Sequence, residues 1–129
     1  FVYYRVKEEF GLSEDNIKTG VTLTKEGTMN EFDVMFFYNG MLYTIECKTS
    51  IRNKESNIMT ETIYKVKALQ NNLGYYSDSN IFTLSSRENG EVRREHIERG
   101  LIFDIDVYCR EDILNCTDLS KMLKIKKVH

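Results

Sequence analysis

The chain has 129 residues, of which 41% are hydrophobic, and a formal net charge of −2. This length predicts a single domain, and no apolar run is long enough to span a membrane or resembles a signal peptide. The negative charge argues against a strong non-specific nucleic-acid binder, because such affinity comes mainly from neutralised phosphates. Three cysteines without a CxxC pair predict reduced thiols and a cytoplasmic protein.

The first predicted element is an amphipathic helix at the N-terminus. Gly11 is suited to end this helix, and Glu8 and Glu9 in its last part are expected to be solvated. No capping residue precedes the helix, so we expect the chain to begin inside a helix of a longer protein. Its apolar face is formed by Phe1, Tyr4, Val6 and Phe10.

A β-hairpin is predicted for residues 30–50, after a short strand at 21–25 and a turn at Glu26-Gly27. Asn39-Gly40 is the strongest hairpin signal, because a type I′ turn needs φ > 0 at both central residues. A two-residue turn makes the numbers of opposed residues sum to 79, so Asp33 is expected to oppose Glu46. Both faces carry apolar residues, which predicts a sheet covered on both sides.

Two carboxylates therefore project from one face of the hairpin, with Lys48 on the same face. Directly opposed side chains have Cβ atoms about 4.5–5.5 Å apart, so Asp33 and Glu46 repel unless a proton or cation lies between them. Hard oxygen ligands suit Mg²⁺ or Mn²⁺. Two interpretations remain open: a divalent metal site, or a structural cluster that shares a proton or forms a salt bridge.

The rest of the chain continues with alternating helices and strands. We expect a loop at 53–57, a helix at 58–73 ended by Gly74, and a strand at 81–85. A helix at 91–99 ended by Gly100 and a strand at 101–108 follow. One or two helices are expected within 112–126, with Thr117 or Asp118 as the N-cap. The order is a helix, three strands, a helix and a strand, then an appended helix, strand and helix.

An Asp, a short hairpin and Glu-x-Lys stand here as Asp33 and Glu46-Cys47-Lys48. This pattern resembles the PD-(D/E)XK signature of restriction-endonuclease-like nucleases. The wording NEFDVMF and IECKTS resembles in particular the C-terminal nuclease domain of CRISPR-associated effectors that carry an N-terminal CARF sensor domain. The resemblance implies an α/β fold with an αβββαβ core, a mixed central sheet and an appended C-terminal helix-strand-helix. It also implies that residues 1–129 form one nuclease domain and that a further acidic residue lies just ahead of Phe1.

The resemblance implies Asp33, Glu46 and Lys48 as catalytic residues and Mg²⁺ or Mn²⁺ as the cofactor. Asp33, Glu46 and the backbone carbonyl of Cys47 would hold the metal, which lowers the pKa of bound water and acts as a Lewis acid. Lys48 would either hold or deprotonate the attacking water or offset charge on the phosphate. The side chain of Cys47 points away from the metal face and is not expected to be a nucleophile.

Three further residues are weaker candidates for the site. Glu31 is expected opposite Lys48, either as the partner that orients the lysine or as a plain cross-strand salt bridge. Thr49 either binds phosphate or belongs to a turn that ends the strand. Lys65 either reaches the site from the next helix or lies on a solvated helix face.

The expected function is a metal-dependent endonuclease that hydrolyses phosphodiester bonds in single-stranded DNA or RNA, or in DNA. The resemblance implies type III CRISPR antiviral defence, a homodimer, and activation by cyclic oligoadenylate through a domain outside this chain. Two alternatives stay open. One is a DNA repair, recombination or restriction nuclease of the same fold, and the other is a non-catalytic nuclease-like module for binding or dimerisation.

Overall fold

A five-stranded sheet with the order β1-β2-β3-β4-β5 forms the centre of the molecule. The computed structural model describes residues 2–25, 28–48, 57–73 and 77–128. Neighbouring strands are antiparallel from β1 to β3 and parallel from β3 to β5, so the predicted mixed α/β sheet is confirmed. The strands are β1 (Ile17–Lys25), β2 (Thr28–Tyr38), β3 (Met41–Lys48), β4 (Ser77–Thr83) and β5 (Ile105–Tyr108).

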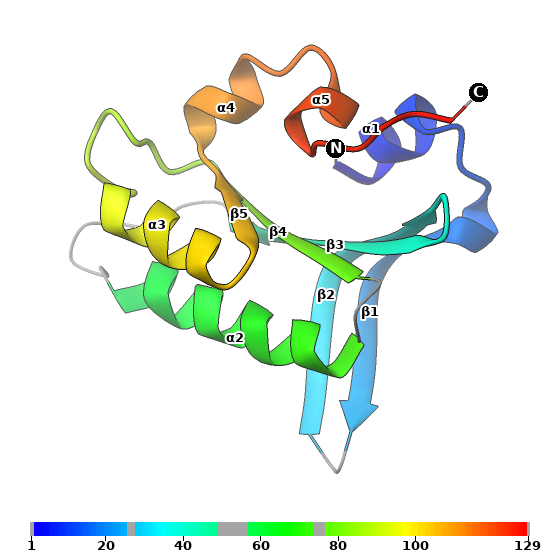
Figure 1. The fold of residues 1–129 in the computed structure, drawn as a ribbon, viewed down its shortest axis with the longest axis horizontal. Coiled ribbons are helices and arrows are strands. Elements are labelled where there is room, and N and C mark those ends of the chain that lie inside the picture. Colours follow the sequence, from blue (N-terminus) through cyan, green and yellow to red (C-terminus); the bar gives the residue numbers. More distant parts are fainter. Residues whose placement is uncertain (1, 26–27, 49–56, 74–76, 129) are drawn as a thin grey trace.

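Helices cover the sheet on both sides (Figure 1). One side, here called the α2 face, is covered by α2 (Asn57–Leu73) and α3 (Arg94–Ile102). The other side, the α1 face, is covered by α1 (Val2–Glu9), α4 (Arg110–Leu114) and α5 (Leu119–Met122). A 3-10 turn, Glu14–Asn16, leads from α1 into β1.

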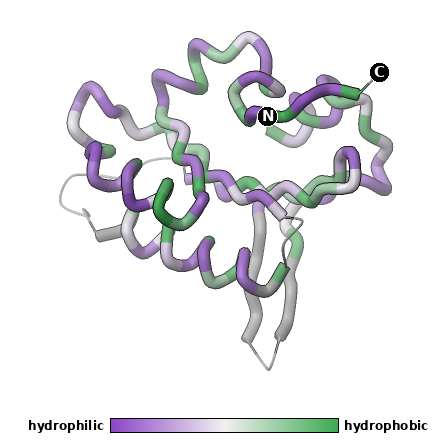
Figure 2. Tube along the Cα trace, viewed as in Figure 1, coloured by the Kyte–Doolittle hydropathy of each residue, from purple (hydrophilic) through white to green (hydrophobic). Residues whose placement is uncertain are grey.

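Each face has its own hydrophobic core. Hydrophobic and hydrophilic residues alternate along α2 and α3, as amphipathic helices require (Figure 2). On the α2 face the buried residues include Met59, Ile63, Val66, Ile81 and Ile105. On the α1 face they include Val6, Phe10, Val34, Phe36, Ile45 and Phe82.

The predicted hairpin is confirmed at its turn and in its register. Asn39 and Gly40 have φ values of 50° and 78°, as a type I′ turn requires. Opposed residues sum to 79 from Tyr38–Met41 to Val34–Ile45. The expected cover is incomplete at the turn, where the side chain of Phe37 is 54% exposed. Here the prediction of two buried faces is wrong for the α2 face, because α2 and α3 pack mainly on β4 and β5.

The first helix matches the prediction except at Tyr4 and at Glu9, expected to be solvated, and Phe1 lies outside the described residues. Val6 and Phe10 are buried, and Gly11 ends the helix with a φ of 62°. Tyr4 is 72% exposed and is not part of the core. Glu9 accepts hydrogen bonds from the backbone N–H groups of residues 119 and 120, so this carboxylate anchors α5 and takes no part in the hairpin cluster.

The third helix ends later than its glycine predicts. α3 continues through Gly100 to Ile102, and the chain then reverses at Asp104, whose φ is 59°. A Cβ atom on Gly100 would lie 2.6 Å from the carbonyl oxygen of Ile105, so this glycine allows close packing of α3 on β5. The predicted strand at 101–108 is therefore shortened to β5.

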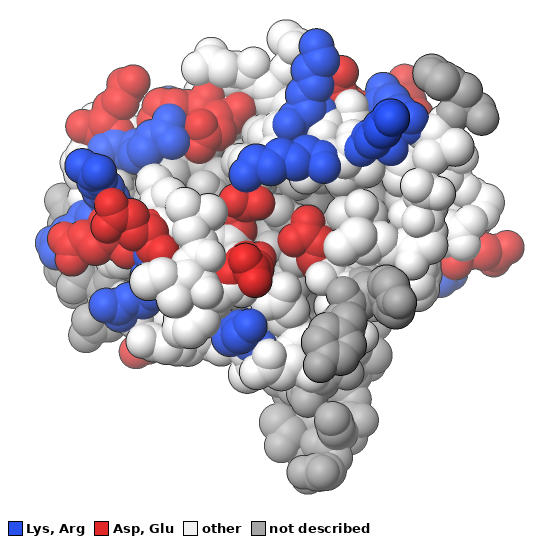
Figure 3. Space-filling view, in the orientation of Figure 1, with Lys and Arg blue, Asp and Glu red and all other residues white. Residues whose placement is uncertain are grey.

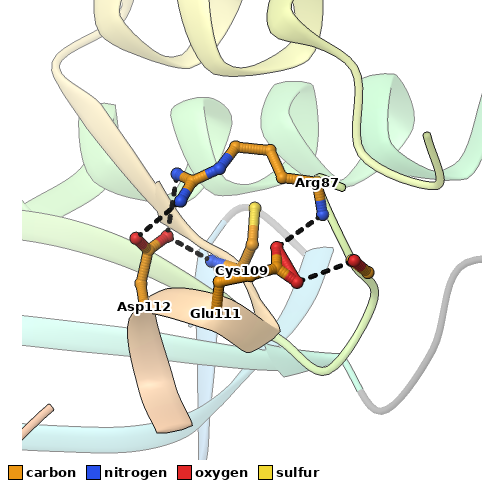
Figure 4. Close-up of polar contacts among 5 residues, drawn as sticks. Arg87, Cys109, Glu111 and Asp112 are labelled. Carbon is orange, nitrogen blue, oxygen red and sulfur yellow. Dashed lines mark hydrogen bonds and ion pairs between the residues drawn. The ribbon is translucent and has the colours of Figure 1, made fainter. Parts of the chain in front are cut away.

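The end of β4 is fastened to the start of α4 by a polar brace (Figure 4). The guanidinium of Arg87 contacts both carboxylate oxygens of Asp112, at 3.2 and 3.1 Å. Asp112 also accepts from the backbone N–H of Cys109, and Glu111 accepts from the Ser86 hydroxyl and the Arg87 N–H. These bonds lower the pKa of Glu111, the Ser86 hydroxyl contributing most.

The C-terminal helices follow their predicted cap. Asp118, rather than Thr117, caps α5 by accepting a hydrogen bond from the backbone N–H of Ser120. None of the helices in the described ranges is both long enough and apolar enough to cross a membrane. The predictions for Glu26-Gly27, for residues 53–56 and for Gly74 lie outside the described residues.

Candidate active site

The residues of the predicted motif meet at the carboxyl end of β3. Residues 46–48 close this strand and lie beside residues 81–83 at the end of the parallel strand β4. Asp33 comes from β2, on the other side of β3. The motif residues thus come from two neighbouring strands, β2 and β3, and lie together at the carboxyl end of the parallel strands β3 and β4.

The strand that carries Asp33 separates from β3 at this point. The β2–β3 register stops at Val34–Ile45, so the expected ladder pair of Asp33 and Glu46 is not formed. On its other side, β2 passes from the pair Thr19–Val34 directly to Val21–Phe32. Gly20, which would oppose Asp33, has a φ of 56°. A left-handed glycine inside a strand bends it, and β1 and β2 run on together as an arm beyond the sheet (Figure 1).

The carboxylate of Asp33 replaces the missing backbone partner of β3. Its Oδ2 accepts a hydrogen bond of 2.7 Å from the backbone N–H of Cys47. This short, charge-assisted bond fixes the carboxylate against the residue that follows Glu46. The two acidic residues are therefore brought together through the backbone of the motif, and not by direct opposition in the ladder.

Glu46 is a buried carboxylate between two lysines. It is 5% exposed, and its Oε1 lies 3.7 Å from the Lys48 ammonium and 3.2 Å from the Lys65 ammonium. Lys65 comes from α2, so of the two alternatives for this residue the one observed is that it reaches the site from the helix. The other carboxylate oxygen of Glu46, Oε2, is buried and has no hydrogen-bond partner among the described residues.

Cys47 presents its backbone to Asp33 and its side chain to the α1 face. The carbonyl of Lys48 accepts from Leu84 of the loop after β4, so the carbonyl of Cys47, one residue earlier, is directed toward β2. Burial first, then the charges of Asp33 and Glu46, raise the pKa of the Cys47 thiol to about 11. A thiol with this pKa stays protonated at neutral pH, in agreement with its exclusion as a nucleophile.

Two of the weaker candidates, Glu31 and Thr49, have side chains outside the described residues. The backbone of Glu31 pairs with Thr22 of β1, beyond the last β2–β3 pair, so the expected opposition to Lys48 is not formed. Sequence reasoning also missed Gly20, although an isolated glycine in a strand pattern is a signal for a bend.

The donor set fits a divalent ion shared with a substrate. Across the described ranges, no group of three or more acidic, histidine or cysteine side chains is arranged to hold a metal by itself. Mg²⁺, however, is commonly held by one or two carboxylates together with water and substrate phosphate. Asp33, the partnerless Oε2 of Glu46 and the Cys47 carbonyl are hard oxygen donors of this kind.

Comparison with known protein families decides the membership of the chain. The model of the family described as "Card1-like, endonuclease domain" matches residues 1–115. The chain belongs to this family. The matched range contains the whole sheet and every predicted site residue of the Card1-like endonuclease domain. A search of curated proteins finds no match.

Solved structures share the fold of this Card1-like domain. Can2 from Sulfobacillus thermosulfidooxidans, solved in complex with cyclic tetra-adenylate, is 21% identical with a TM-score of 0.72. The alignment covers 93% of this chain and 32% of Can2. Protein VC1899 from Vibrio cholerae is 21% identical with a TM-score of 0.67, covering 94% of this chain and 31% of VC1899. Protein AF1548 is 21% identical with a TM-score of 0.52, covering 84% and 54%.

These similarities establish the fold of this domain. They concern only part of each longer protein. This chain spans about a third of Can2 and of VC1899. The αβββαβ core expected from the sequence is thus found within longer proteins.

Proposed function

We propose that this domain is a metal-dependent nuclease that hydrolyses phosphodiester bonds with Asp33, Glu46 and Lys48. The observation that carries the proposal is the buried carboxylate of Glu46, which has one oxygen between two lysines and the other without a described partner. A structural salt bridge does not require a second, empty carboxylate oxygen, and burial of an unsatisfied charged atom is costly. A cation at this oxygen would remove that cost.

Each residue has a defined task in this proposal. Asp33 and Glu46 would hold Mg²⁺ or Mn²⁺ together with the Cys47 carbonyl, and a metal held there would supply Lewis-acid chemistry: a lower pKa of bound water and neutralised phosphate charge. Lys48, whose side chain is 35% exposed, reaches both Glu46 and solvent. It is therefore placed to orient the attacking water or to contact a phosphate oxygen. Lys65 balances the charge of Glu46 from the helix side.

The charge distribution favours a local contact with nucleic acid over a long basic track. Acidic side chains gather in the middle of the face seen in Figure 3, with basic side chains along its upper edge. We infer that the substrate is single-stranded DNA or RNA held at the strand ends through a few phosphate contacts, so that its affinity falls only modestly with salt.

The wider context is also part of the proposal. The Can2 structure contains cyclic tetra-adenylate, and Can2 is about three times longer than this chain. We propose that this domain likewise acts in a CRISPR-associated protein, as a homodimer, and is activated by cyclic oligoadenylate bound outside residues 1–129.

The test is cleavage of labelled single-stranded DNA, single-stranded RNA and plasmid by the full-length protein. Reactions contain Mn²⁺, Mg²⁺ or EDTA, each with and without cyclic tetra-adenylate. Cleavage that requires metal and is lost in Glu46→Gln supports the nuclease, whereas Glu98→Gln, an exposed glutamate on α3, is the matched control and stays active. Cutting indifferent to the cyclic nucleotide would indicate a repair or restriction enzyme. No cutting under any condition would leave a non-catalytic module.

A further inference from the structure

The sheet end that carries the motif also opens into a pocket on the opposite, α1 face. The pocket has a volume of about 620 Å³. Its floor is the sheet surface at Val34, Cys47 and Phe82, and its walls come from α1 and α4. Lys48, Thr83 and Leu84 line it where β3 and β4 end. One residue, Lys48, therefore belongs both to this pocket and to the carboxylate cluster.

The pocket wall is apolar and partly exposed. Leu84 and Leu114 line it and are 51% and 68% exposed. Large apolar side chains that gather in one exposed concave site indicate a ligand or partner more often than scattered ones do. The aromatic ring of Tyr3 completes the wall on the side of α1.

The charge at the pocket comes from Arg5. None of its described lining residues is acidic, although the whole chain is negative, and the ammonium of Lys48 lies beside Glu46 on the α2 face. The guanidinium of Arg5 is held by a hydrogen bond of 3.1 Å to the carbonyl of Cys116. This contact uses one of the five N–H donors of a guanidinium, which can also serve a base edge or a phosphate.

We propose that this pocket binds a nucleobase of the strand that is being cut. The inference rests on the proposed function, and it adds the site that receives the nucleotide next to the scissile phosphate. A phosphate at Lys48 places the neighbouring nucleotide at the end of β3 and β4, from which its base can enter the apolar pocket. A base enters only when it is unstacked and unpaired, so the pocket selects single strands and flexible ends over duplex.

The test reads the position of one missing base from a cleavage ladder. The substrate is an end-labelled single-stranded DNA of uniform sequence with one stable abasic analogue, cut by the full-length protein with Mn²⁺ and cyclic tetra-adenylate. Linkages at one fixed offset from the abasic position should be cut about tenfold more slowly, because a base–aromatic or apolar contact of this kind is worth about that factor. Other linkages should be cut at the rate found in the unmodified strand.

The slowly cut position appears as a gap in the cleavage ladder. The double variant Leu84→Asn with Leu114→Asn tests whether this gap arises from the pocket. In this double variant all linkages should be cut more slowly, and the gap at the fixed offset should disappear. Both leucines are exposed, so the fold does not depend on them. Leu101→Asn is the matched control, because Leu101 is 52% exposed on α3 and does not line the pocket; its gap should persist.

The outcomes separate the two proposals. A full ladder without a gap, or a gap that survives in the double variant, overturns the nucleobase pocket and leaves the nuclease intact. Absence of any ladder overturns the nuclease and the pocket with it. A double variant that keeps the gap but loses its dimer in light-scattering measurements would show that the pocket binds a second copy of the chain instead.

Discussion

Lys65 is the residue for which the structure adds most to the sequence. Its replacement tests how the negative charge of Glu46 is compensated. Its ammonium lies 3.2 Å from Glu46 Oε1. Two unit charges at this distance attract by about 5 kcal/mol at an effective dielectric constant of about 20. Lys65 is 44% exposed and Lys48 remains at 3.7 Å, so solvent and the second lysine reduce the loss. We expect Lys65→Met to lower the free energy of unfolding by about 1–2 kcal/mol in EDTA.

The same variant should behave differently when metal is present. A divalent ion bound at Glu46 supplies the positive charge that Lys65 supplies without it. In saturating Mn²⁺ the difference in the free energy of unfolding between wild type and Lys65→Met should therefore shrink to below about 0.5 kcal/mol. The reason is that Mn²⁺ should bind the folded variant, which lacks the competing lysine, more tightly than it binds wild type, and tighter binding to the folded state stabilises it more. Urea denaturation followed by circular dichroism, in EDTA and in Mn²⁺, measures both differences.

Lys67→Met is the matched control for this comparison. Lys67 lies on the same helix, and its ammonium is placed over the ring of Phe103 at 5.9 Å, away from Glu46. Its replacement should have the same small effect with and without Mn²⁺. If Lys65→Met loses equal stability in EDTA and in Mn²⁺, then Lys65 and the metal do not share Glu46, and the charge argument is refuted.

Three further predictions concern other parts of the sheet and its loops. Burial first, then the neighbouring Asp106, raise the pKa of Asp78 to about 6, so the folded state binds the extra proton and stability falls as pH rises from about 4 to about 6. Asp78→Asn should therefore be more stable than wild type at pH 7.5 by about 1 kcal/mol, a value reduced for solvent screening, and show no gain at pH 4 in urea denaturation; an equal effect at both pH values would contradict this. Asp112→Asn should weaken the brace to Arg87 and lower the melting temperature by about 4 °C, and an unchanged value by calorimetry would show that the brace adds no stability. Gly20→Ala should cost about 1 kcal/mol through its φ of 56° and also slow cleavage by displacing Asp33. Gly11→Ala, at a φ of 62° after α1 and near the turn end of the hairpin, should cost stability alone; equal cleavage by both variants would refute the role of the bend.

The local parts of this fold could be predicted from the sequence. The turn at Asn39-Gly40 fixes the register over five pairs, because two residues with positive φ determine which side chains are opposed. Glu46 and Lys48 then share a face by the two-residue period of a strand. The cap at Asp118 is local in the same sense, since its carboxylate binds a backbone N–H two residues away.

The missed parts depend on contacts that are distant in the sequence. β4 begins at Ser77, before the predicted strand at 81–85, and its polar residues Ser79 and Asn80 are 0% and 1% exposed because β3 and β5 flank them. Gly100 is a helix terminator by its chemistry, but the close approach of Ile105 keeps it inside α3. Lys65 reaches Glu46 because α2 packs on the sheet at that point, and helical periodicity alone does not reveal the partner across the face.

The irregularity at Asp33 explains how a mostly regular hairpin can form the proposed catalytic site. In an uninterrupted ladder, the N–H of Cys47 would bind a backbone carbonyl of β2, and the Asp33 carboxylate would have no fixed position. Because β2 leaves β3 after Val34, this N–H is free to hold the carboxylate at 2.7 Å. The same departure ends the backbone cover beside the Cys47 carbonyl. The bend at Gly20 thus converts a ladder position into an acidic site, at the cost of the lost strand pairs and of a position that glycine alone adopts readily.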